Sequence, residues 1–144
     1  MLLLSTNTMA QTTSGLINDI LRNVNLYRTH HGLKPLILKS YISKEAQTHS
    51  IAMAKHKISF GHAGFEKRIK TIYAKTQNPN GAAENVAYNY KDGNDVVKNW
   101  LKSPHHLTNI KGNYNYTGIG IAKDTNGKLY FTQIFLKTKH SQSI

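Results

Sequence analysis

The feature that most constrains the fold is a change of hydrophobic period in the last third of the chain. Before it, apolar residues recur at the three- and four-residue spacing of amphipathic helices. After it, YTGIGIA and KLYFTQIFLK alternate or run apolar and are rich in β-branched and aromatic residues, joined by the turn sequence DTNG at 124–127. Helices followed by a β-hairpin predict an α+β domain in which helices pack on an antiparallel sheet.

Local signals divide the chain of 144 residues into one domain and two short ends. Ser14 is the predicted N-cap of the first helix, and Gly32 its left-handed end. Segment 78–88 is interpreted as a turn followed by a short apolar segment. The expected helices are 15–31, 40–56 and 94–102, with helical pieces at 65–73 and 104–110, and the expected strands are 116–123 and 128–137.

The two ends are assigned separately from the domain, which we expect to span 14–138. Residues 1–13 begin with a short apolar run and reach Thr8-Met9-Ala10, which is similar to the small-residue pattern before a signal cleavage site. We interpret this segment as a signal-peptide remnant or a disordered N-terminus, and 139–144 as a tail. No later stretch approaches the roughly 18 apolar residues of a membrane span.

The charge and the composition of the chain limit which classes of ligand and site it can have. The formal net charge is +12, from 19 Lys and Arg against 7 Asp and Glu, which favours anionic lipid, wall polymers or other acidic ligands. The basic residues are dispersed, and no helix-turn-helix, RNP-like or zinc-finger spacing favours nucleic acid. The absence of cysteine excludes disulfides, thiol nucleophiles and Cys-ligated metals.

Glu84 is the acidic residue that most needs an explanation. It lies in GAAENVAY among small and apolar residues, with no lysine within six positions on either side. Burying a carboxylate without a partner is costly, so Glu84 should have hydrogen bonds, a cation or a metal.

Two adjacent histidines begin the helical piece SPHHLTNI. With Ser103 as N-cap and Pro104 at the first helical position, His105 and His106 lie in the first turn, where the helix dipole favours neutral imidazole. Neutral imidazole binds a metal or accepts a proton, although a capping role would also suit this position. Trp100, Ser103 and His106 should share one face, leaving His105 in solvent. We therefore expect His106 to be the functional histidine, and His49 to be a satisfied core histidine.

Seven segments, in order, carry a resemblance to a known family. They are NLYRTHHGLKPL, KEAQTHSIAMA, FGHAG, AENVAY, VVKNWLKSPHHLTNI, YTGIGIA and LYFTQIF, and they span 16–136. The chain resembles the CAP superfamily of cysteine-rich secretory, antigen-five and pathogenesis-related proteins, in its bacterial SCP-like form. The resemblance implies a three-layer α-β-α sandwich.

The resemblance also implies a cleft lined by two histidines and two acidic residues, often able to hold a divalent metal. His62 of FGHAG, Glu84 of ENVA and His106 of S-P-x-H match three of these positions, whereas Ser103 stands where many eukaryotic members have a second glutamate. We expect the first three side chains to converge and to suit Zn²⁺ or another divalent cation. The expected supporting residues are Asn85, Trp100, Ser103, Tyr130 and Gln133.

Three functional hypotheses follow from these features. The first is a monomeric, secreted, periplasmic or envelope-associated domain that acts mainly by binding a lipid, wall polymer or protein through the cleft. The alternative is a metal-dependent hydrolase of an envelope polymer, peptide or lipid ester, with Glu84 as base or ligand. The third is a purely structural hydrogen-bond network of His62, Glu84 and His106. The missing second acid disfavours acid–base catalysis.

Overall fold

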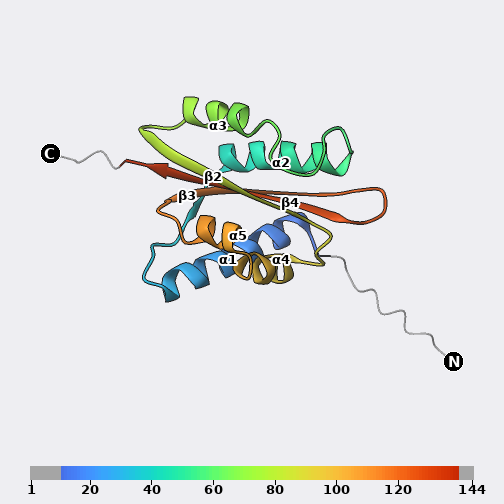
Figure 1. Ribbon diagram of the computed structural model, residues 1–144, viewed down its shortest axis with the longest axis horizontal. Helices are drawn as coiled ribbons and strands as arrows, with labels where there is room; N and C mark the ends of the chain where they lie inside the picture. Colours follow the sequence, from blue (N-terminus) through green and yellow to red (C-terminus); the bar gives the residue numbers. More distant parts are fainter. Residues whose placement is uncertain (1–10, 140–144) are drawn as a thin grey trace.

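The computed structural model describes residues 11–139, which form a sheet between two layers of helices (Figure 1). Helices α1, α4 and α5 cover one face, and α2 and α3 cover the other. This arrangement confirms the predicted α-β-α sandwich. The helices are α1 (Thr13–His30), α2 (Ser40–Ala54), α3 (Phe65–Ala74), α4 (Gly93–Leu101) and α5 (Pro104–Ile110), and the strands are β1 (Ile37–Leu38), β2 (Pro79–Tyr88), β3 (Tyr116–Lys123) and β4 (Leu129–Thr138).

The sheet has the strand order β1-β3-β4-β2 and is mixed. Strand β4 pairs antiparallel with both β3 and β2, but β1 pairs parallel with β3, through Ile37 with Tyr116 and Leu38 with Thr117. The predicted antiparallel sheet is confirmed for β2, β3 and β4, whereas the two-residue pairing of β1 with β3 is parallel. A pair this short leaves no periodic pattern in the sequence.

Strand β2 was missed, because segment 78–88 was interpreted as a turn and a short apolar piece. Both faces of this strand are covered by helices, and four consecutive residues in its second half, 84–87, are all buried. Two of the four are polar, Glu84 and Asn85, so the alternation that identifies a half-buried strand does not occur.

The helix boundaries differ from the predicted ones by no more than two residues, with one change of cap. Helix α1 begins at Thr13, and the hydroxyl of Thr12 accepts a hydrogen bond from the Gly15 N–H at 3.1 Å. Thr12, and not Ser14, is therefore the N-cap. Gly32 has the left-handed backbone expected of a helix end, with φ of 72°. Residues 1–10 and 140–144, which include most of the expected signal-peptide remnant and tail, lie outside the described residues.

Helix α2 packs directly on β3 at two glycines, Gly118 and Gly120. A Cβ atom at either position would lie well inside 3.0 Å of the backbone of α2, around Ile42 and Ser43 in one case and Ala46 and Gln47 in the other. The two glycines therefore set how closely the α2 layer approaches the sheet.

A buried arginine joins the end of α1 to the segment after α5. The Arg28 guanidinium donates to the carbonyls of Lys34 (2.9 Å), Ile110 (2.8 Å), Gly112 (2.8 Å) and Tyr114 (3.0 Å). Burial lowers the pKa of Arg28. These bonds fix two loops at the end of the sheet where β4 finishes (Figure 1).

No helix within residues 11–139 combines the length and the apolar character required to cross a membrane.

Candidate functional site

The candidate site is a cleft of about 460 Å³ at the free edge of β2. The segment between α2 and α3 approaches this edge from one helical layer, and α4 and α5 approach it from the other. The lining residues are Phe60, Gly61, His62, Val86, Ala87, Tyr88, Tyr90, Asn99, Trp100, Ser103 and His106.

His106 faces the cleft, whereas His105 is exposed, which is the orientation expected from their places in the first turn of α5. The His106 Nδ1 atom lies 2.8 Å from the Ser103 hydroxyl, and its ring stacks on Trp100 with centroids 6.1 Å apart. Burial is the main cause that lowers the pKa of His106, and the nearby His62 lowers it further, against a backbone contact at Val86 that raises it. His106 is therefore a neutral imidazole at neutral pH.

His62 lies at the mouth of the cleft and contacts the buried carboxylate behind it. Its side chain is 54% exposed, and its Nδ1 atom lies 2.9 Å from Glu84 Oε1, whose side chain is 1% exposed. The two expected site residues are thus in direct contact, one accessible to solvent and the other inaccessible.

Glu84 has a cation as its partner, one of the three possibilities expected from its apolar surroundings. Arg68 of α3 donates from Nε to Oε2 at 2.9 Å and from Nη2 to Oε1 at 2.8 Å, so both carboxylate oxygens are held in a bidentate pair. His49 lies 4.0 Å from the same carboxylate and bonds to the Gly61 carbonyl at 2.7 Å. Burial lowers the pKa of His49, and this histidine is satisfied within the core as predicted.

Sequence reasoning missed Arg68, although a signal was present. Arg68 occurs in FEKRIK, where a basic residue usually lies in solvent. Phe65, Ile69 and Ile72 recur at helical spacing, and this spacing places Arg68 on the apolar face of α3. An arginine on an apolar helix face needs an anion, and Glu84 was the carboxylate without a local partner.

The three residues expected to hold a metal do not form a three-ligand set. Consecutive strand residues point to opposite faces, so Glu84 faces α2 and α3 whereas Asn85 faces α5. Within residues 11–139, no group of three His, Asp or Glu side chains is arranged to hold a metal ion. Because Arg68 already binds both Glu84 oxygens, this donor set does not fit a zinc site that includes Glu84.

Three of the five expected supporting residues act at the cleft. Trp100 and Ser103 line it, and Asn85 positions α5 by donating to the His106 carbonyl at 3.1 Å. Tyr130 lies outside the cleft and stacks on Tyr88 with ring centroids 5.6 Å apart. Gln133 is fully buried and donates to the Thr117 hydroxyl at 3.1 Å.

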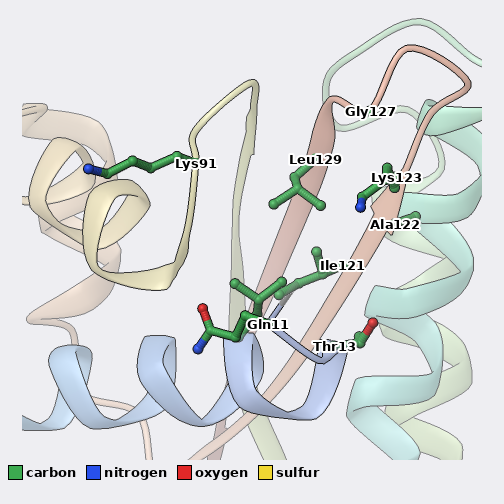
Figure 2. Close-up of a pocket in the computed structure, with 9 residues that line it drawn as sticks. Gln11, Thr13, Lys91, Ile121, Ala122, Lys123, Gly127 and Leu129 are labelled. Atoms are coloured by element: carbon green, nitrogen blue, oxygen red, sulfur yellow. The ribbon is translucent and has the colours of Figure 1, made fainter. Parts of the chain in front are cut away.

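A different hollow, of about 320 Å³, lies where α1 begins beside the β3–β4 hairpin (Figure 2). Lys91 and Lys123 flank it, and none of its described lining residues is a histidine or an acid. The cleft at β2 is therefore the better candidate for a functional site.

The family follows from comparison with known sequences. The profile of the CAP family, described as the cysteine-rich secretory protein family, matches residues 21–135. The chain belongs to the CAP family. This membership confirms the resemblance carried by the seven sequence segments.

Relatives of this CAP domain include longer bacterial proteins. The chain is 33% identical over 131 residues to the uncharacterized membrane protein YlbC of Bacillus subtilis (strain 168), a match that covers 88% of this chain and 35% of that protein. The chain thus spans about a third of the length of this relative.

Two solved structures share the fold. An outer surface protein of Borrelia burgdorferi superposes with a TM-score of 0.77 at 22% identity, covering 89% of this chain and 96% of that one. An extracellular protein containing an SCP domain from Bacillus anthracis also gives 0.77, at 24% identity, covering 94% of this chain and 44% of that one.

His49 and His106 predict that this CAP domain loses stability as the pH falls below about 6.5, the ordinary histidine value. The pKa values of His49 and His106 are lowered in the folded state. As the pH falls, these histidines therefore take up protons in the unfolded chain before they do so in the folded one. The free energy of unfolding decreases over the pH range between the unfolded and the folded pKa values. Urea denaturation at about pH 7.5 and about pH 5.5 measures this loss.

Between the two pH values, the variant His106→Asn should lose less free energy of unfolding than the wild type. The exposed control His105→Asn should lose as much as the wild type. Equal losses in all three proteins would contradict the assignment of the lowered pKa to His106.

Proposed function

We propose that this CAP domain is a secreted or envelope-associated protein that binds a wall polymer in the cleft at β2. Two fold relatives are an outer surface protein and an extracellular protein, which supports this location. The net charge of +12 also suits the anionic surroundings of an envelope.

A pair of exposed aromatic rings at the cleft is the main evidence for a wall polymer as the ligand. Phe60 is 47% exposed and Tyr88 is 45% exposed, and their centroids lie 4.9 Å apart. Both line the cleft together with the polar side chains of His62 and His106. Flat apolar rings beside hydrogen-bonding groups suit a sugar ring, which has an apolar face and polar hydroxyls at its rim.

The state of Glu84 favours binding over hydrolysis. A general base must reach the proton that it removes, but the Glu84 carboxylate is buried and both of its oxygens are bound by Arg68. The position of a second acid is occupied by Ser103, whose hydroxyl contacts His106. The described residues that line the cleft therefore include no carboxylate that could serve a metal-dependent hydrolase.

The binding experiment is cosedimentation with insoluble peptidoglycan that has been stripped of anionic polymers. We expect the double variant Phe60→Ala/Tyr88→Ala to reduce affinity by about tenfold or more, because each exposed ring contributes about 1 kcal/mol of packing. The matched control is Ile37→Ala, an exposed apolar residue, 56% accessible, on the opposite edge strand β1.

Three outcomes would contradict the proposal: equal binding of the double variant and wild type, retention only by phospholipid vesicles, and release of soluble sugar from the polymer. The last would instead support the hydrolase.

Metal removal gives a separate prediction. Retention on peptidoglycan should be unchanged when a chelator is present, because the proposed contacts are aromatic rings and histidine side chains and require no ion. Zinc was expected at His62, Glu84 and His106. Because Arg68 binds both Glu84 oxygens, zinc binding stays a prediction for the two histidines, and calorimetric titration of Zn²⁺ into wild type and His106→Ala measures it. Loss of polymer binding on chelation would show that the cleft depends on a metal.

A further inference from the structure

A basic groove lies at the other end of the molecule from the β3–β4 hairpin, where β4 finishes (Figure 1). It has a volume of about 710 Å³ and is lined by four lysines. They come from three separate segments: Lys34 after α1, Lys111 after α5, and Lys137 and Lys139 at the end of β4. The fold therefore gathers positive charge that is dispersed in the sequence.

Within the part of the chain that the structure describes, no acidic side chain offsets this charge. All seven Asp and Glu residues fall within residues 11–139, and none of them lines the groove or pairs with its lysines. Arg28 also lines the groove, and its guanidinium is bound by backbone carbonyls, which leave its positive charge in place. A hollow with walls of one charge concentrates the electrostatic field and attracts ions of the opposite sign.

We propose that this basic groove binds a linear phosphate-bearing polymer, at a site separate from the histidine cleft. Lysine ammonium groups are compact point charges with several donors, which suit phosphates that repeat along a chain. Lysines from three segments can contact successive phosphates, so the attraction accumulates along the polymer.

The shape and lining of the groove favour such a polymer over two other polyanions. The lysines line a hollow, which a chain can enter and a flat bilayer cannot. Proteins bind single-stranded nucleic acid by stacking its bases on exposed aromatic rings. The described residues that line the groove include one aromatic residue, Tyr114. Its ring is partly buried and packs on Phe135 with centroids 5.7 Å apart, so it offers no exposed face for stacking.

The test is calorimetric titration with poly(glycerol phosphate) at low salt, comparing two triple variants of equal charge. Lys34→Gln/Lys111→Gln/Lys137→Gln removes groove lysines, and Lys91→Gln/Lys123→Gln/Lys128→Gln removes three at the hairpin end, two of which flank the hollow in Figure 2. Each variant lowers the formal net charge from +12 by three, to +9.

We expect the groove variant to lose about tenfold or more in affinity and the hairpin variant less than about twofold. The slope of log affinity against log salt should fall by about 2 in the groove variant alone, at roughly 0.7 for each phosphate contact. Phe60→Ala/Tyr88→Ala should bind the polymer like the wild type, because the cleft is a separate site.

Equal losses in the two triple variants would overturn the proposal, because net charge alone would explain binding. Binding to anionic vesicles or to single-stranded DNA that depends on the groove, without binding to poly(glycerol phosphate), would also overturn it. Circular dichroism melting of both triple variants should match the wild type, since the substituted lysines form no ion pair among the described residues.

Discussion

Replacing Gly120 with alanine should destabilise this CAP domain by at least about 3 kcal/mol, and replacing it with valine should prevent folding. The added Cβ would overlap the backbone of α2 at Ala46 and Gln47, and a backbone segment cannot move aside as a flexible side chain can. Gly118→Ala should have a similar effect through Ile42 and Ser43. Urea denaturation followed by far-ultraviolet circular dichroism measures both.

The control is Gly127→Asn in the β3–β4 turn. Gly127 has a left-handed backbone with φ of 83° and open space where a Cβ would be, and asparagine tolerates this conformation. Its loss of stability should stay below about 1 kcal/mol. If Gly120→Ala unfolded at the same urea concentration as Gly127→Asn, the close approach of α2 to β3 would be refuted.

Arg68→Met should cost about 3–5 kcal/mol at neutral pH. The substitution keeps an unbranched apolar side chain of similar length but leaves the Glu84 carboxylate buried without its bidentate partner. The remaining neighbours, His62 at 2.9 Å and His49 at 4.0 Å, both lie on the Oε1 side of the carboxylate. A buried charge that has lost its counter-ion is among the largest single destabilising changes in a protein.

The double variant Arg68→Met/Glu84→Leu separates the ion pair from the packing of α3. Removing both charges leaves no buried unpaired group, so this variant should recover most of the stability lost by Arg68→Met. If the double variant were as unstable as the single one, the loss would come from packing around α3 and not from the charge on Glu84.

The sequence was most informative where the deciding interactions are local. Ser103 and Pro104 predicted the start of α5, and therefore which of two adjacent histidines faces the cleft. The DTNG turn predicted the β3–β4 hairpin, in which the Asp124 carboxylate accepts from the backbone of Asn126 and Lys128. In both cases the residues that fix the geometry are neighbours along the chain.

Features that depend on distant residues were predicted only in part. The surroundings of Glu84 predicted that it has a partner, but the partner is sixteen residues away on α3 and belongs to a segment whose sequence is typical of a solvated surface. The convergence of Glu84 with His106 was expected from motifs, yet the Glu84 side chain points to the α3 face of β2 whereas His106 lies on the α5 face. Sequence spacing does not show which face of a strand a helix will cover.

The strand order also determines when folding can occur. Strand β4 follows the other described strands along the chain but lies inside the sheet, between β3 and β2. Until residues 129–138 have been synthesised, β2 has no partner strand among the described ones, and β3 has only its two-residue pairing with β1. The sheet of this domain can therefore be completed only after β4 has emerged from the ribosome, and its completion depends on contacts between distant residues.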